Sequence, residues 1–207
     1  MTWNNDRDDV AFFEPILAKK DCQLRIDFAE PAIWEVKLKD KWSSQGASQM
    51  GPYIGKKYQA MGISLTIIDY DVKTEHEGAQ IRRAITHQIN LEKYPFWNEK
   101  KGEVGWMGKQ QLYDLEKAMG FDPAFMVGSE RVEPVTTKAG NKVAPKAEGV
   151  KQIINPDFFS AYFNSDGTVN PTNWINKVVF ADVDVEKSEQ YGDKNVVVRF
   201  KKVPVTA

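Results

Sequence analysis

Basic side chains alternate with aromatic ones in two segments of the chain, around residues 53–58 and 93–97. Lysine and arginine neutralise phosphates while aromatic rings stack on bases, which is the combination that holds a single nucleic-acid strand. Each stacked base contributes about 1–3 kcal/mol, whatever the base. The residues that we expect to contact such a strand are Lys37, Lys39, Tyr53, Lys56, Lys57, Tyr58, Arg82, Lys93, Tyr94 and Trp97. The lysines and Arg82 would pair with phosphates, and the tyrosines and Trp97 would stack.

Acidic residues support a rival hypothesis. Asp69 and Asp71 share one face of a predicted strand, and Asp182, Asp184 and Glu186 share one face of another. Acids two residues apart can hold a divalent cation together, as in metal-dependent nucleases. A solvated strand face explains the same pattern, because acids also discourage pairing at a sheet edge. Since no histidine or lysine stands at a spacing that completes an active site, we expect a protein without catalytic residues.

Other enzyme chemistry lacks its residues. The single cysteine, Cys22, excludes an intramolecular disulfide and favours a reducing compartment. Only His76 and His87 accompany it, so the short paired spacing of a structural zinc site is missing. The sequence GKK at 55–57 lacks the upstream glycine and the following Ser or Thr of a phosphate-binding loop. We therefore expect no metal and no cofactor.

Charge and hydropathy exclude two further classes of protein. The 207 residues carry a net charge of −1, which argues against a protein that binds duplex DNA by bulk charge. Single-strand binding needs only a local basic groove, so it stays open. No apolar run approaches the roughly 18 residues of a membrane-spanning helix. The N-terminal segment is acidic and polar, unlike a signal peptide. We expect a cytoplasmic protein with no membrane contact.

Five strand-like segments and one helix provide the elements that position these residues. Apolar alternation predicts strands over 34–42, 63–73, 81–91, 174–186 and 195–203. Leucines at helical spacing before Gly120 predict a helix over 109–119. A helix between the third and fourth strands predicts a mainly β fold, namely a five-stranded OB-fold-like Greek-key barrel, which binds oligonucleotides through strands two and three and two loops. Adjacent Ile67 and Ile68 predict a β-bulge in strand two.

The predicted barrel has long insertions. We expect an N-terminal lead-in over 1–30, a single OB-like domain over 31–203 and a short tail over 204–207. The glycine-rich stretch 43–62 reads as a long loop, too rich in glycine for a stable helix. A Pro-, Lys- and Gly-rich insertion around 128–155 is expected to be flexible. Trp106, beside the predicted helix, is expected to pack beneath the barrel.

The C-terminal half resembles a family of small phage-encoded proteins found beside recombination and replication genes. The helix matches its pattern through Leu112, Leu115, Ala118 and Gly120. The last hairpin matches through Asn176, Lys177, Val179, Val183, Tyr191, Asn195 and Val197. The resemblance implies an OB-like protein that binds single-stranded DNA in the host cytoplasm, acts in phage replication or recombination and has proteins of those processes as partners.

Three functions remain open on the sequence alone. The first is non-catalytic binding of single-stranded DNA, with homo-oligomers forming through an edge strand. The second is a protein–protein interaction module without nucleic-acid binding, which a near-neutral charge fits equally well. The third is a metal-dependent nuclease that uses Asp69, Asp71 or the acids of the fourth strand.

Overall fold

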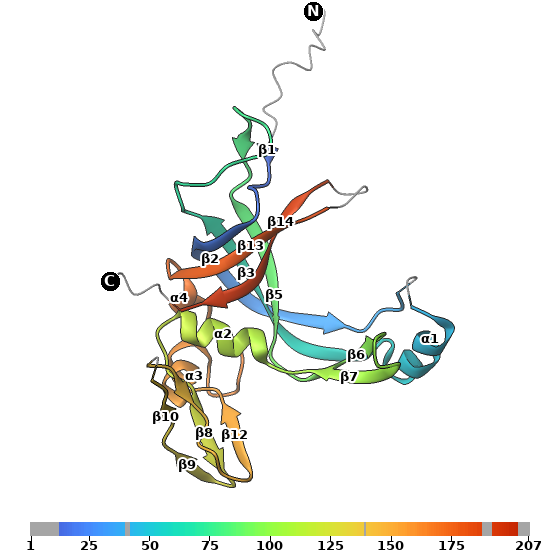
Figure 1. The fold of residues 1–207 in the computed structure, drawn as a ribbon, viewed down its shortest axis with the longest axis vertical. Coiled ribbons are helices and arrows are strands. Elements are labelled where there is room, and N and C mark those ends of the chain that lie inside the picture. The colour runs from blue at the N-terminus through green and yellow to red at the C-terminus, as the bar shows by residue number, and fades with distance from the viewer. Residues whose placement is uncertain (1–12, 40–41, 139, 188–191, 203–207) are drawn as a thin grey trace, which may run out of the picture.

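The computed structural model describes residues 13–39, 42–138, 140–187 and 192–202 (Figure 1). Residues 1–12 of the lead-in expected over 1–30, the tail over 204–207 and Tyr191 of the hairpin pattern lie outside the described residues.

The centre of the protein is an antiparallel sheet of five strands. In chain order the strands are β2 (Lys19–Glu35), β3 (Lys57–Ile67), β5 (Ala84–Asn90), β13 (Val178–Glu186) and β14 (Lys194–Lys201). They lie side by side in the order β14-β13-β2-β3-β5. The expected mainly β fold with five principal strands is therefore confirmed.

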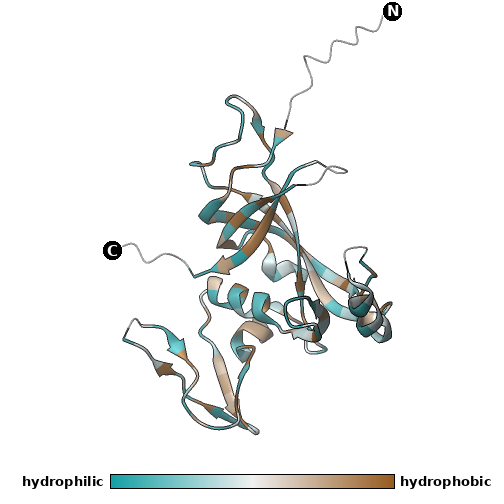
Figure 2. Ribbon diagram, turned by 45° about the vertical axis from the view of Figure 1, so that its right-hand side comes forward, coloured by the Kyte–Doolittle hydropathy of each residue, from teal (hydrophilic) through white to brown (hydrophobic). Residues whose placement is uncertain are grey.

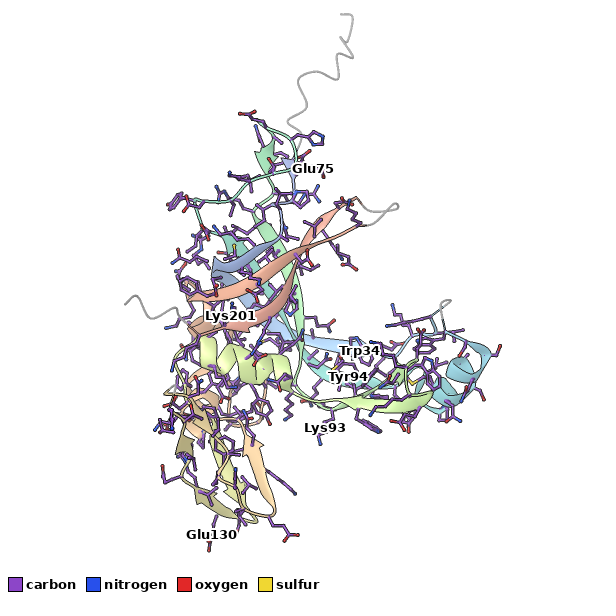
Figure 3. The ribbon with its side chains drawn as sticks, in the orientation of Figure 1. Trp34, Glu75, Lys93, Tyr94, Glu130 and Lys201 are labelled. Carbon is purple, nitrogen blue, oxygen red and sulfur yellow. The ribbon has the colours of Figure 1, made fainter. Side chains whose placement is uncertain are left out.

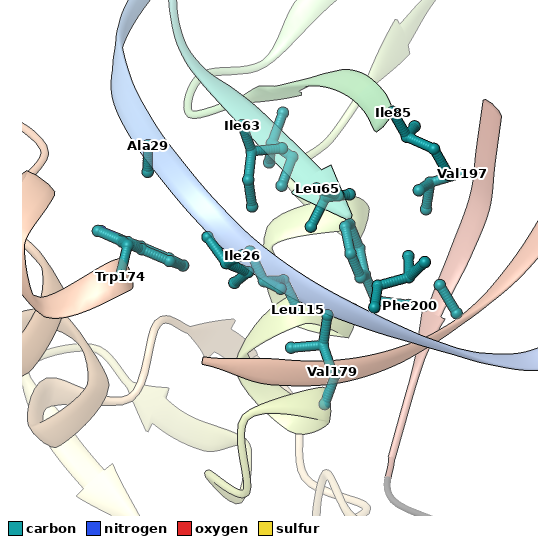
Figure 4. Close-up of a cluster of buried hydrophobic side chains, with 14 of the residues drawn as sticks. Ile26, Ala29, Ile63, Leu65, Ile85, Leu115, Trp174, Val179, Val197 and Phe200 are labelled. Carbon is teal, nitrogen blue, oxygen red and sulfur yellow. The ribbon is translucent and has the colours of Figure 1, made fainter. Parts of the chain in front are cut away.

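The sheet does not close into a barrel, because no hydrogen-bonded ladder joins β14 to β5 among the described residues. The sheet curls so that these two edge strands approach each other, and Ile85 of β5 lies near Val197 of β14 in Figure 4. The rings of His87 and Phe200 lie edge to face there, with centroids 5.8 Å apart. Side-chain packing, rather than backbone hydrogen bonding, brings the two edges together.

The boundaries of the first two strands differ from those predicted. β2 begins at Lys19, so residues 19–30 lie in the sheet and are not a lead-in. Cys22, Leu24 and Ile26 alternate inward and are fully buried, which explains why this segment joins the sheet. β2 ends at Glu35 and β3 runs over 57–67, each earlier than predicted. The β-bulge lies in β2, between Ile26 and Phe28, and not at Ile67.

The main core lies between the sheet and three helices, α2 (Gln110–Ala118), α3 (Pro156–Tyr162) and α4 (Pro171–Trp174). Helix α2 confirms the predicted helix, and Leu115 is buried against the sheet (Figure 4). Trp174 was predicted to open a strand, but it ends α4 and is fully buried. Its indole Nε1 donates a hydrogen bond to the carbonyl of Tyr162 at 3.0 Å, which satisfies the buried donor.

An arm extends from the sheet (Figure 1). We define the arm as residues 33–58 and 94–107 in so far as they are described. It comprises the ends of β2 and β3, helix α1 (Ser44–Met50), the 3₁₀ turn η2 (Gly51–Tyr53) and the hairpin of β6 (Tyr94–Asn98) and β7 (Glu103–Met107). The prediction of a loop over 43–62 is therefore wrong in part. Ser43 caps α1 by accepting a hydrogen bond from the Gly46 N–H at 3.1 Å.

The segment around 128–155, predicted to be a flexible insertion, contains paired strands. β8 (Ala124–Val127) lies between β9 (Glu130–Val132) and β12 (Val150–Ile153) in a three-stranded sheet. β10 (Val135–Thr136) pairs with β11 (Lys142–Val143). Near the opposite end of the molecule, β1 (Phe13–Glu14) pairs with β4 (Gln80–Ile81). Figure 2 shows long apolar stretches on the strands of the central sheet and a more mixed colouring in the arm and the insertion.

Candidate nucleic-acid interface

The arm and the start of its hairpin contain every predicted contact residue except Arg82. Lys37 and Lys39 follow β2, Tyr53 ends η2, and Lys56 immediately precedes β3. The other predicted residues in this region are Lys57 and Tyr58 on β3, Lys93 just before β6, and Tyr94 and Trp97 on β6. The structure thus brings together two basic and aromatic segments that are about 40 residues apart in the sequence.

Strand register places residues 34–36 next to residues 55–58. Trp34 of β2 lies opposite Tyr58 of β3, and the pairing continues beyond β2 because the Val36 N–H donates to the Lys56 carbonyl at 3.1 Å. The Gly55 N–H donates back to the Val36 carbonyl at 2.9 Å. Lys57 lies opposite Glu35, and Lys56 lies across the hairpin from Val36, the residue before Lys37, so several basic residues lie at this end of the arm.

The arm has its own small core. Val36, Met50 and Trp97 are buried together, separately from the main core. Helix α1 approaches the indole of Trp97 so closely that a Cβ on Gly46 would lie 2.8 Å from its Nε1. Only glycine fits this contact without a shift, so the position of α1 depends on Gly46.

Aromatic rings cover the outside of this core. The ring centroids of Trp34 and Tyr94 are 4.3 Å apart (Figure 3), and those of Trp34 and Tyr58 are 6.0 Å apart. Tyr53 meets Trp106 edge to face at 5.7 Å, and the Lys56 ammonium lies 5.0 Å from the centroid of the Tyr53 ring. These contacts hold the rings in fixed positions before any ligand binds, which lowers the entropy cost of stacking.

A groove of about 750 Å³ lies along one side of the arm. The residues that line it are Trp34, Glu35, Val36, Lys37, Lys39, Trp42, Met50, Tyr94, Pro95, Phe96, Trp97, Asn98, Glu99, Lys100 and Met107. Burial raises the pKa of the Tyr94 hydroxyl, so this ring is neutral at physiological pH. Lys37, Lys39 and Lys100 make no ion pair within the part of the chain that the structure describes, so they are free to bind phosphate.

Only Lys37, Lys39, Tyr94 and Trp97 of the ten predicted contact residues line the groove. The predicted residues that do not line it are Tyr53, Lys56, Lys57, Tyr58, Lys93 and Arg82. Trp97 is 9% exposed and belongs to the core of the arm, so its ring faces are not accessible to a base. Arg82 lies between β4 and β5, directly after the strand that pairs with β1, and Figure 1 shows β1 far from the arm. Its backbone N–H donates to the Glu14 carbonyl at 2.7 Å and its guanidinium donates to the Asp193 carbonyl at 3.3 Å. These contacts tie Arg82 to the far end of the sheet.

The sequence-based prediction of contact residues did not include two tryptophans that the structure places in the arm. Trp34 was predicted only as part of a strand, yet it lines the groove beside Tyr94. Trp106 was expected to be packed beneath a barrel, but it is 55% exposed on β7. Its position in a strand that follows a charged turn, KKGE at 100–103, is the signal that could have identified an exposed hairpin.

The acids of the nuclease hypothesis make structural contacts. The Asp69 carboxylate pairs with the Lys19 ammonium at 2.9 Å and accepts backbone hydrogen bonds from Gln23 and Asp71. Burial opposes ionisation there, but these hydrogen bonds outweigh it and lower the pKa of Asp69. Asp182 pairs with Lys201 at 3.2 Å. Within the described ranges, no group of three or more His, Cys, Asp or Glu side chains is placed to hold a metal ion.

No family model, no curated protein and no solved structure gives a significant match to the chain. The resemblance to phage-encoded proteins therefore stays a prediction. None of the described helices is long and apolar enough to cross a membrane.

Proposed function

We propose that this protein binds single-stranded DNA without catalysing a reaction, and that the groove of the arm is its binding site. The observation that carries the proposal is that two distant parts of the chain line one groove with basic and aromatic side chains: Trp34, Lys37 and Lys39 come from the first, and Tyr94 and Lys100 from the second. Lys37, Lys39 and Lys100 would neutralise phosphates, while Trp34 and Tyr94 would stack on bases. Because stacking and phosphate pairing tolerate any sequence, we expect little sequence preference.

We further propose that the sheet is an OB-like barrel left open between β5 and β14. The order β13-β2-β3-β5 supports this, since three consecutive strands with the fourth beside the first make a Greek key. The arm replaces the loop between the first two strands, which in OB-folds contributes to the ligand surface. The fold adds to the proposal but does not carry it, because one fold serves many functions.

The biological setting rests on the resemblance described above. We propose a role in phage replication or recombination, in the host cytoplasm, with proteins of those processes as partners. Within the described residues, β5 and β14 are the edge strands of the sheet, and pairing through one of them would give a homo-oligomer.

Fluorescence anisotropy with a labelled oligo(dT) tests the proposal, with an equimolar duplex as the control. We expect tighter binding to the single strand, and a log–log salt slope of about −0.7 for each phosphate contacted. The double variant Lys37→Ala, Lys39→Ala should bind more weakly and with a shallower salt slope. A matched control, Lys20→Ala with Lys73→Ala, removes two exposed lysines outside the arm and should bind like the unaltered protein. Absence of binding at low salt would overturn the proposal.

A protein-binding role is the second candidate, because the arm exposes large apolar side chains. Ile33, Leu38 and Ile54 are 60%, 58% and 41% exposed, respectively. All three belong to the arm, and exposed apolar patches are a common feature of protein interfaces. If the protein fails to bind oligo(dT) but captures a partner that a triple substitution of these residues to serine releases, this second function replaces the first.

A further inference from the structure

We propose that the DNA path does not end at the arm but continues across α2 and β14 to the insertion, whose β10–β11 hairpin forms the far wall of the path. This inference rests on the proposed function and extends it. It gives the insertion a role in binding and predicts a longer site than the arm alone provides.

Three cavities adjoin one another along the proposed path. A cavity of about 490 Å³ adjoins the groove of the arm and shares Tyr94 and Met107 with it. A third cavity, of about 480 Å³, shares Asp114 and Arg199 with the second. Helix α2 lies between the arm and the insertion in Figure 1, so the three cavities follow one another along the molecule. A flexible strand can therefore pass from one to the next.

The middle cavity offers polar groups without strong charge. Asn90, Gln110 and Gln111 line it, and amide side chains can both donate hydrogen bonds to bases and accept them. The one carboxylate there, Asp114, accepts a hydrogen bond from Gln110 at 2.9 Å and lies 3.8 Å from the Arg199 guanidinium. Its negative charge is thereby compensated, so this stretch need not repel a phosphate chain.

The third cavity is basic. The basic residues that line it are Lys117, Lys142, Arg199, Lys201 and Lys202, and the acidic residues are Asp114 and Asp122. Lys201 is already paired with Asp21 at 2.8 Å and with Asp182 at 3.2 Å. Lys117, Lys142 and Lys202 make no ion pair within the described residues, so they are available to phosphates.

The walls of the third cavity come from three elements. Lys117 belongs to α2, Arg199 and Lys201 to β14, and Lys142 and Val143 to β11 of the insertion. A strand lying here would contact the central sheet on one side and the insertion on the other. This arrangement accounts for a hairpin whose residues Val135 and Val143 are exposed and contribute nothing to the main core.

Binding measured against strand length tests the inference. Single OB-folds cover about 4–16 nucleotides. We therefore compare oligo(dT) of about 6 nucleotides, enough for the arm, with oligo(dT) of about 20 nucleotides, enough for the whole path. In the double variant Lys142→Ala, Lys202→Ala, the affinity for the long strand should fall about fivefold, as expected for two exposed charge contacts. The affinity for the short strand should stay unchanged.

The control variant is Lys146→Ala with Lys151→Ala, which removes the same charge from exposed insertion residues that do not line the cavity. It should bind both strands like the unaltered protein. If the long strand binds no better than the short one, or if both double variants weaken it equally, the path ends at the arm and the inference is wrong while the proposed function stands. If neither strand binds, the proposed function fails first. The same series in oligo(U) reports whether RNA occupies the path.

Discussion

A single methyl group added to α1 tests how the arm is built. Gly46 and Gly51 can be compared directly because both have a helical backbone. Gly46 lies within α1, and Gly51 follows it with the right-handed helical dihedrals φ −45° and ψ −49°. A Cβ at Gly46 would lie 2.8, 2.9 and 3.0 Å from three atoms of the Trp97 ring, whereas a Cβ at Gly51 meets nothing within 4 Å. The same substitution therefore has opposite consequences at the two positions.

The magnitude follows from the difference between the two variants. Replacing glycine by alanine in a helical conformation stabilises a protein by about 0.4–1 kcal/mol through the unfolded chain, and this gain is common to both. Overpacking a rigid ring costs about 1–3 kcal/mol and applies only to Gly46→Ala. Gly46→Ala should thus be less stable than Gly51→Ala by about 1–3 kcal/mol.

Amide hydrogen exchange is the suitable assay, because it resolves the stability of the arm from that of the sheet. Gly46→Ala should lose protection in β6 and β7 while β13 and β14 keep theirs, and it should bind oligo(dT) more weakly. Equal protection in the two variants, or greater protection in Gly46→Ala, would refute the close packing of α1 on Trp97 and with it the account of how the groove is held.

Three further predictions concern the core, pH and stacking. Leu115→Ala should lower the free energy of unfolding in urea by about 2–5 kcal/mol, because the side chain is fully buried, whereas the exposed Val198→Ala should stay within about 0.5 kcal/mol of the unaltered protein. Burial raises the pKa of Glu116 from 4.5 to about 7, so the folded state keeps a proton that the unfolded state releases. The contribution of this group to stability should therefore fall as pH rises between these two values. In Glu116→Gln the midpoint of urea unfolding should depend less on pH in this range. Tyr94→Ala should weaken oligo(dT) binding by about 1–3 kcal/mol, while Tyr94→Phe, which keeps the ring, should retain it in the same anisotropy titration.

The spacing of apolar residues predicted those helices and strands whose pattern lies within one continuous segment. Helix α2 was predicted because Leu112, Leu115 and Ala118 recur at helical spacing and are buried on one face. Strand β14 was predicted because Val196, Val198 and Phe200 alternate with Val197, Arg199 and Lys201. In the structure Val197 and Phe200 are the buried apolar residues of this strand. In β2 the alternation of Cys22, Leu24 and Ile26 was present as well, but Pro31 was interpreted as a boundary, so residues 1–30 were predicted to be a lead-in. Burial by two neighbouring strands overrode those local preferences.

The arm could not be predicted in the same way, because its contacts depend on register between distant segments. Nothing within residues 34–58 indicates that Trp34 will lie 4.3 Å from the Tyr94 ring, since that contact requires β6 to return along the β2–β3 hairpin. The glycines at 46, 51 and 55 argued against a helix, yet α1 forms because Gly46 allows close packing on Trp97. Tertiary packing here outweighs helix propensity, which amounts to only about 1 kcal/mol per glycine.

The separation of the two cores has a consequence for how stability and binding are related. Val36, Met50 and Trp97 form a cluster distinct from the one that contains Leu115 and Trp174. A small cluster buries little apolar area, so the arm should open locally at a lower free energy than the whole protein unfolds. Substitutions in the arm should then reduce DNA binding before they reduce global stability, and substitutions in the main core should do the reverse. Gly46→Ala and Leu115→Ala, measured side by side for oligo(dT) affinity and urea unfolding, should therefore rank in opposite orders. If the two variants rank in the same order in both measurements, the arm and the sheet unfold as one unit, and the groove does not open independently of the main core.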